Sequence, residues 1–233
     1  MTTKYSKTNP ESIQNLFDTI APTYDRTNTL ISLGLHKRWN QKLIQTIGSP
    51  SHLLDLCCGT GEIGLGWLAT QTTPKQCTLA DFSTEMLSVA EKKPHHPMHT
   101  TAFIKADAQK LPFESNSFDT VAISYGIRNV ADPLAALREV HRVLSPGSTL
   151  HILELTQPKN PLLRTGHHFY LRSLLPLFGG LLSGNHAAYR YLSTSIPAFL
   201  SPSHFTSLLT QAGFTPSATP LAGGIATLFS GQS

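Results

Sequence analysis

The chain has 233 residues, 40% of them hydrophobic and 14% charged, with a net charge of +4. This length suits one large α/β domain with a buried core, and the composition excludes a globally disordered chain. The basic residues are scattered, which argues against a nucleic-acid partner, and three cysteines cannot all pair, so a reducing cytoplasm is the expected location.

The N-terminal residues 1–10 are polar and are expected to lack stable structure. They also lack the apolar core of a secretory signal. The most apolar run, SLLPLFGGLL at 173–182, is shorter than the roughly 20 residues that a membrane-spanning helix needs. We therefore expect a chain that does not cross a membrane, although the sequence allows peripheral contact with the inner face of one. The sequence does not determine the oligomeric state.

Residues 11–47 have the pattern of short helices, broken at Ala21 and Pro22. From Leu53 onward, short β-like runs alternate with helix-like runs: HLLDL, IGLGWLATQ, CTLADF, TEMLSVAEKK, AFIKAD, DTVAISY, PLAALREVHRVL and TLHILEL. Ser83 and Asp132 are suited to start helices, and residues 145–147 to stop one. This alternation predicts a doubly wound, mostly parallel sheet covered by helices on both faces.

The remaining segments depart from that alternation. Residues 159–200 are apolar and interrupted by Pro and Gly, whereas the tail offers a helix, SHFTSLLTQAGF, and a strand, IATLFS. We expect one domain over residues 1–233. Its parts would be a helical lid at 11–47, a cofactor-binding core at 53–158, an apolar substrate lid at 159–200, and a C-terminal helix and strand at 201–233.

A glycine loop follows the first predicted strand in LLDLCCGTGEIG. Gly59, Gly61 and Gly64 spell G-x-G-x-x-G, and Asp81 follows at the interval typical of nicotinamide-binding folds. Asp55 favours another cofactor, because S-adenosylmethionine brings an ammonium and a sulfonium rather than a pyrophosphate that needs a helix N-terminus. The loop therefore predicts an S-adenosylmethionine site, with an NAD oxidoreductase as the alternative.

Polar residues at the later strand ends support the same cofactor. Asp81 can accept hydrogen bonds from both ribose hydroxyls, and Asp107 with Ala108 can accept one from the adenine amine. Ser124 lies at the strand end where such sheets bind ligands. The cofactor-binding candidates are Asp55, Gly59, Thr60, Gly61, Asp81, Asp107, Ala108 and Ser124.

The cysteines Cys57, Cys58 and Cys77 do not have the paired spacing of a structural zinc site. A disulfide between adjacent cysteines would also strain the turn. We expect no metal and interpret these residues as small, burial-prone side chains.

Further motifs resemble one family. The segment FDTIAPTYDRTNTLISLGLHKRW, the loop YGIRNVAD and the segment RVLSPGSTLHILELT resemble the S-adenosylmethionine-dependent C-methyltransferases of menaquinone and ubiquinone biosynthesis. The resemblance runs from about Leu16 to Phe214. The departures from its motifs are Thr27 for Met, Cys57-Cys58 for Ala-Gly, Ser145 for Lys, Ser148 for Gly and Thr156 for Ser.

The resemblance implies a prenylated hydroquinone as the substrate, with C-methylation of demethylmenaquinol to menaquinol as the expected reaction. Residues 169–200 would shelter the prenyl tail, and His36 and Trp39 are expected to fix the lid helix rather than touch the substrate. The open alternatives are a benzoquinol of ubiquinone biosynthesis, another small acceptor, and a binding protein that has lost the chemistry.

Methylating a ring carbon requires electron density there, which deprotonation of the adjacent hydroxyl supplies. Arg128 follows the fourth strand and is always charged, so it is expected to stabilise the phenolate. Asn129 would orient a hydroxyl. Tyr24 and Asp25 would face the ring from the lid, with one of them or a water as the base.

Overall fold

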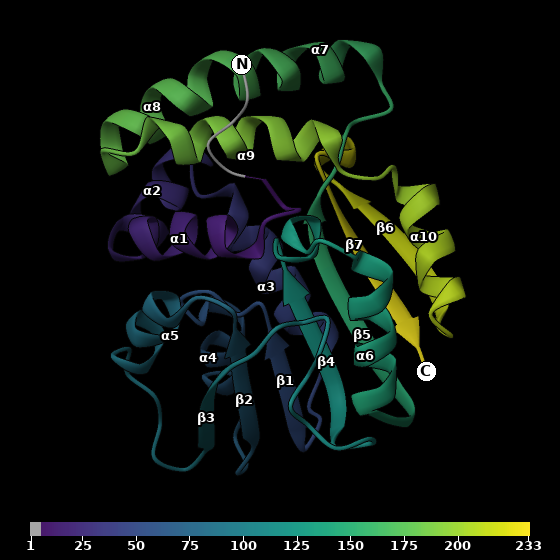
Figure 1. Ribbon diagram of the computed structural model, residues 1–233. Coiled ribbons are helices and arrows are strands. Elements are labelled where there is room, and N and C mark those ends of the chain that lie inside the picture. The colour runs from purple at the N-terminus through teal and green to yellow at the C-terminus, as the bar shows by residue number, and fades with distance from the viewer. Residues whose placement is uncertain (1–5) are drawn as a thin grey trace.

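The computed structural model describes residues 6–233 and is built around a seven-stranded sheet of order β3-β2-β1-β4-β5-β7-β6 (Figure 1). The parallel pairs are β3–β2, β2–β1, β1–β4 and β4–β5, and β7 runs antiparallel to both β5 and β6. The strands are β1 (His52–Leu56), β2 (Gln76–Asp81), β3 (Thr100–Lys105), β4 (Phe118–Ser124), β5 (Leu144–Leu155), β6 (Thr215–Leu221) and β7 (Ala226–Gln232). The predicted doubly wound, mostly parallel sheet is confirmed.

Helices cover both faces of this sheet. The helical segments of the described residues are α1 (Pro10–Ile20), η1 (Ala21–Thr23), α2 (Tyr24–Ile31), α3 (Leu35–Ile47), α4 (Glu62–Leu68), α5 (Thr84–Glu91), η2 (Ile127–Asn129), α6 (Pro133–Val143), α7 (Pro161–Phe169), η3 (Tyr170–Leu174), α8 (Leu175–Ser183), α9 (His186–Ala198), α10 (Pro202–Gln211) and η4 (Ala222–Gly224). One core packs α6 and α10 against the sheet, and a second packs α3, α4 and α5 against its other face. Because helices cover both faces, Val121, Ala122 and Ile123 of β4 are all fully buried.

A third core joins the N-terminal helices to the segment after β5. Leu16 and Ile20 of α1 pack with Leu171 of η3 and Tyr189 of α9. Figure 1 shows α7, α8 and α9 above α1 and α2, beyond the carboxyl ends of the parallel strands. The Tyr170 hydroxyl donates to the Ile31 carbonyl at 2.7 Å, which links η3 to the end of α2.

The helix-start signals are confirmed. The Ser83 hydroxyl accepts from the Met86 amide at 3.1 Å, and Asp132 caps α6 in the same way. The expectation that residues 1–10 lack structure is wrong at its end, because Asn9 caps α1 and Pro10 is its first residue. Residues 1–5 of that segment lie outside the described residues.

Two elements differ from the sequence prediction. Strand β6, TPSATPL, was not predicted, because it is a mostly exposed edge strand with two prolines and pairs with β7 alone. Within residues 159–200, Gly179 and Gly180 lie inside α8, and the π-helical segment η3 joins α7 to α8 without a break, whereas Gly184 ends α8 as expected of a glycine. Across residues 6–233, no helix is both long and apolar enough to cross a membrane.

Candidate functional site

The glycine loop lies between β1 and α4 and is shaped by left-handed backbone. Cys57 has φ 55°, Gly59 has φ 53° and Gly61 has φ 77°. A Cβ on Gly61 would lie 3.0 Å from the Leu79 side chain, whereas one on Gly59 would meet nothing within 4 Å. Gly61 therefore allows close packing against the sheet, and Gly59 presents bare backbone to open space.

Asp55 lies beneath this loop. Its carboxylate is fully buried and accepts from the Gly64 amide at 2.8 Å, so it holds the first turn of α4. Burial raises the pKa of Asp55 to about 7, against the opposing effect of the Gly64 amide. A Cβ on Gly64 would come within 3.0 Å of the same carboxylate, so Gly64 allows α4 to pack closely against β1.

Asp81 ties the loop to the end of β2. Its two carboxylate oxygens accept from the Gly59 amide and the Ser83 amide, each at 2.8 Å. Each oxygen keeps acceptor capacity, since a carboxylate offers about four lone-pair sites. Asp81 also lines a pocket, so it can both shape the loop and accept hydroxyl donors from a ligand.

A smaller pocket of about 110 Å³ runs along the strand ends, with Gly59, Asp81, Asp107, Ala108 and Ser124 in its wall. Asp107 lies in the turn after β3, two residues beyond the strand, where its carboxylate accepts from the Gln109 amide at 2.9 Å. The Ser124 hydroxyl is buried without a hydrogen-bond partner among the described residues. Five of the eight cofactor candidates thus share this wall.

A larger cavity of about 920 Å³ adjoins the smaller pocket. The two share a wall made of Tyr24, Cys57, Gly59, Ser124 and Tyr125. Most of the larger cavity is lined by apolar side chains from α2, α3, η3, α8 and α9 and from the turn that starts α7, among them Trp39, Leu163, Leu171, Leu175, Leu192 and Ile196. Thr60 also lines it, whereas Asp55 and Gly61 line neither space.

Arg128 lies on the wall of the larger cavity, in a buried ion pair. Its Nη1 is 2.6 Å from Glu154 Oε1 and donates also to the Tyr125 carbonyl at 2.6 Å. The side chains of Arg128 and Glu154 are only 4% and 0% exposed. The guanidinium Nε has no hydrogen-bond partner among the described residues, so this donor remains for a ligand.

The other three catalytic candidates lie in different places. Tyr24 lines both spaces, and burial raises the pKa of its hydroxyl. Asn129 lines only the smaller pocket, where its amide donates to the Tyr125 carbonyl at 3.3 Å and accepts from the Tyr191 hydroxyl at 3.1 Å. Asp25 lines neither space.

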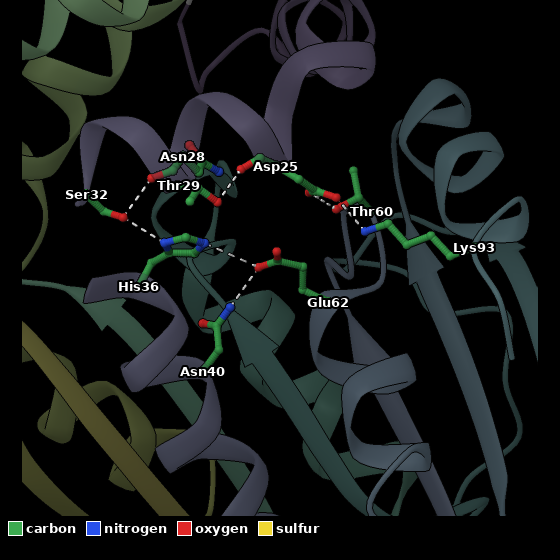
Figure 2. Close-up of polar contacts among 9 residues, drawn as sticks. All are labelled: Asp25, Asn28, Thr29, Ser32, His36, Asn40, Thr60, Glu62 and Lys93. Atoms are coloured by element: carbon green, nitrogen blue, oxygen red, sulfur yellow. Dashed lines mark hydrogen bonds and ion pairs between the residues drawn. The ribbon is translucent and has the colours of Figure 1, made fainter. Parts of the chain in front are cut away.

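Asp25 instead joins the lid helix α2 to the glycine loop (Figure 2). Its two carboxylate oxygens contact the Thr60 hydroxyl and the Lys93 ammonium, each at 2.5 Å. This geometry makes Asp25 a connection between the lid, the loop and the end of α5, rather than a group facing the cavity.

Comparison with known proteins agrees with this geometry. The model of the ubiE/COQ5 methyltransferase family matches residues 4–232. The chain belongs to this family. A demethylmenaquinone methyltransferase of Protochlamydia amoebophila is 45% identical over 234 residues, covering 97% of each chain. One of Chlamydia trachomatis serovar D is 46% identical over 191 residues, covering 81% of each.

Solved structures of methyltransferases share the fold of this family member. A chain in the complex of the Haloferax volcanii Trm112 methyltransferase activator with its methyltransferase has a TM-score of 0.68 at 17% identity, covering 93% of this chain and 96% of that one. An S-adenosylmethionine-dependent methyltransferase of Thermotoga maritima has a TM-score of 0.64 at 18% identity, covering 94% and 98%. These likenesses concern the architecture alone.

The methyltransferase contains a polar cluster that the sequence prediction did not assign to the site. His36, Asn40 and Glu62 line the larger cavity and point toward one another (Figure 2). Glu62 Oε2 accepts from Asn40 Nδ2 at 2.9 Å and lies 3.8 Å from His36 Nε2. His36 and Trp39, expected to fix the lid helix rather than touch the substrate, both line the cavity. The signal was available, since His36 and Asn40 are one turn apart on an amphipathic helix.

The cysteines of this methyltransferase are all free, and Cys58 and Cys77 are buried. Burial raises the pKa of all three thiols, so they stay protonated at neutral pH. The described residues contain no group of three or more His, Cys, Asp or Glu side chains that could hold a metal ion.

Proposed function

We propose that this methyltransferase transfers a methyl group from S-adenosylmethionine to a ring carbon of demethylmenaquinol, giving menaquinol. The observation that carries the proposal is the cavity of about 920 Å³, with mostly apolar walls and a polar cluster near the glycine loop. A prenylated quinol has the same division into a hydrocarbon tail and a polar head. Relatives 45–46% identical that are named demethylmenaquinone methyltransferases support the same reaction.

The smaller pocket suits S-adenosylmethionine. Gly59 presents open backbone, and Ser124 offers a hydroxyl that has no partner in the described part of the chain. Asp81 keeps acceptor capacity for the ribose hydroxyls. Asp107 and Ala108 would contact the adenine, while Asp55, Thr60 and Gly61 would hold the loop in shape. When bound, the cofactor supplies an electrophilic methyl group carried by a sulfonium.

The protein's own residues prepare the acceptor. Arg128, held by Glu154, would stabilise the negative charge that develops on the ring oxygen. Tyr24 would contact the ring between the two spaces, and the apolar wall would exclude water from the head group. Asn129 would position the Tyr125 turn from the cofactor side.

A panel assay tests this proposal and its alternatives. The enzyme is incubated with labelled S-adenosylmethionine and a short-chain demethylmenaquinol, a benzoquinol, a sterol or a simple phenol. Label in the demethylmenaquinol ring supports the proposal, whereas a preference for another acceptor identifies the alternative, and no transfer to any acceptor contradicts it. For the cofactor, Asp81→Ala is expected to weaken S-adenosylmethionine binding in calorimetry, and an unchanged binding constant would refute the ribose role.

We also propose that residues around α7 and α8 contact an anionic membrane surface to receive the quinol. Leu162, Phe169 and Phe178 are 85%, 62% and 51% exposed, and Leu162 also lines the cavity. Beyond Glu154 the sequence has no Asp or Glu, and the lid carries exposed Arg164 and Arg172. Each basic residue near such a surface contributes about 1 kcal/mol.

Vesicle co-sedimentation tests this contact. Phe178→Ser and Arg172→Glu are expected to reduce binding to vesicles of phosphatidylglycerol and phosphatidylcholine, and binding should weaken with salt. Lys75→Glu, at the amino end of β2 and away from the lid, is the matched control. Equal binding by all variants would contradict the proposal.

A further inference from the structure

The polar cluster of the larger cavity has an acceptor atom that finds no hydrogen-bond partner within residues 6–233. His36 is 7% exposed, and its Nε2 makes no hydrogen bond to the described residues. This nitrogen is on the cavity side of α3, 3.8 Å from Glu62 Oε2 (Figure 2). A buried polar atom without a partner is costly, so its retention beside a cavity points to a ligand.

The hydrogen bonds of Ser32 determine which nitrogen of His36 carries the proton. The Ser32 hydroxyl lies 2.7 Å from the Asn28 carbonyl and 2.7 Å from His36 Nδ1. A carbonyl can only accept, so the single hydroxyl proton goes to Asn28, and Ser32 must accept from Nδ1–H. In the neutral imidazole, Nε2 therefore carries the free lone pair and is available as a base.

The other candidate bases in the cavity are less suited. Burial raises the pKa of the Tyr24 hydroxyl, which therefore stays protonated. Asp25 is already engaged by Thr60 and Lys93 and lies outside the cavity wall. Glu154 is fully buried against Arg128. His167 also lines the cavity, and its Nδ1 has no hydrogen-bond partner among the described residues, but no described carboxylate pairs with it. His36 is better suited, because Glu62 lies beside it to balance the charge that it gains.

We propose that His36 Nε2 is the base that removes the proton from the quinol hydroxyl, with Glu62 stabilising the imidazolium. The O–H bond of the hydroxyl breaks, its electron pair stays on the ring oxygen, and the proton forms a new N–H bond on Nε2. The resulting phenolate faces Arg128, and the imidazolium faces Glu62. The inference rests on the proposed function, because it needs a ring hydroxyl in the larger cavity.

The surroundings act on the protonation of both His36 and Glu62. Burial and the neighbouring Lys37 lower the pKa of His36, whereas Asp25 on α2 opposes the shift, so His36 is neutral at neutral pH. Burial, followed by Asp25, raises the pKa of Glu62 on α4. Among the described residues, the other ionisable groups that line the same cavity are Tyr24, Cys57, Cys58, Tyr125, Arg128, His167 and Tyr170, and Glu154 is paired with Arg128 behind the wall.

The rate of methylation should therefore rise with pH through the pKa of His36, below its ordinary value of 6.5. His36→Gln should lower the single-turnover rate by about 10²–10⁴-fold, the usual contribution of a general base, and should remove this acid limb. S-Adenosylmethionine binding, measured by calorimetry, should be unchanged. Wild-type rate and pH profile in His36→Gln would overturn the proposal.

Glu62→Gln keeps an acceptor for Asn40 but removes the charge. The imidazolium then loses its counter-ion, so the midpoint of the acid limb should move to lower pH and the plateau rate should fall. A purely structural role for Glu62 would lower the rate without moving the midpoint. This variant keeps the test decisive even where His36→Gln folds poorly.

A binding assay separates this inference from the proposed function. Ionised 1-naphthol absorbs at longer wavelength than the neutral form, and the wild-type enzyme should increase the ionised fraction while His36→Gln should not. An equal ionised fraction in both proteins would refute the role of His36. Failure of the wild-type enzyme to methylate any quinol would instead refute the proposed function.

Discussion

Replacing Arg128 by alanine removes the cation from a fully buried ion pair and leaves Glu154 without its main partner. Glu154 is 0% exposed and would keep hydrogen bonds from two backbone amides, those of residue 128 at 3.3 Å and Leu155 at 2.7 Å. The substitution deletes two guanidinium hydrogen bonds of 2.6 Å, one to Glu154 and one to the Tyr125 carbonyl. Breaking a buried pair in this way typically costs about 3–5 kcal/mol.

The cost should depend on pH. Burial already raises the pKa of Glu154, although Arg128 opposes the shift, so removing Arg128 raises this pKa further. The folded variant then binds a proton more tightly than the unfolded chain does, and its free energy of unfolding falls as pH rises between the two pKa values. The deficit relative to wild type should be smaller at pH 5 than at pH 8.

Urea denaturation of the wild type, Arg128→Ala and the double variant Arg128→Met with Glu154→Gln measures these differences. The double variant removes both charges, so it should recover most of the lost stability while methylation stays impaired. A free energy of unfolding for Arg128→Ala within about 1 kcal/mol of wild type at pH 8 would refute the buried-pair reasoning. Recovery of both stability and activity in the double variant would show that Arg128 is structural alone.

Three further predictions concern other parts of the molecule. Gly126→Ala places a Cβ 2.3 Å from the Cβ of Cys57. This clash should lower the free energy of unfolding by about 1–3 kcal/mol, measured by thermal unfolding. Adding Cys57→Gly to the same chain should recover most of the lost stability. Burial lowers the pKa of His151 from 6.5 to about 4. The free energy of unfolding should therefore fall by about 3 kcal/mol as the pH is lowered from 6.5 to 4. In urea titrations, His151→Gln should remove this dependence on pH. Asp25→Asn should change stability by less than about 1 kcal/mol, since its pair with Lys93 is partly exposed, yet should weaken S-adenosylmethionine binding in calorimetry; unchanged affinity would contradict the coupling of lid and loop.

The fold could be predicted from the sequence where burial leaves a strong pattern. Strands such as HILEL read as apolar on both faces because helices cover both, and Ser83 marked a helix start by its own hydrogen-bonding chemistry. Strand β6 could not be predicted, since its residues are exposed and its existence depends on pairing with β7. Its two prolines argue against a strand unless the edge position is known.

The site was predictable only as far as neighbouring strand ends could be aligned. Asp81, Asp107 and Ser124 share one pocket because parallel strands end at one edge of the sheet. The expected role of Asp25 depended on which face of α2 is turned toward the cavity. Helical periodicity does not give this orientation, because it is set by packing against a glycine loop that lies far away in the sequence. Glu62 follows the glycine loop directly, but only the packing of α3 against α4 brings His36 to within 3.8 Å of it.

The adjacency of Tyr24 and Asp25 at the start of α2 couples the two spaces. Tyr24 lines the junction of the pocket and the cavity, while Asp25 holds Thr60 in the glycine loop. A movement of α2 that changes the cavity must therefore also pull on the loop that would hold the cofactor. Such coupling is reciprocal, so a bound quinol should tighten S-adenosylmethionine binding by the same factor as the cofactor tightens quinol binding. Because both effects pass through α2, Asp25→Asn should reduce the two factors together, whereas a loss confined to one ligand would place the coupling elsewhere.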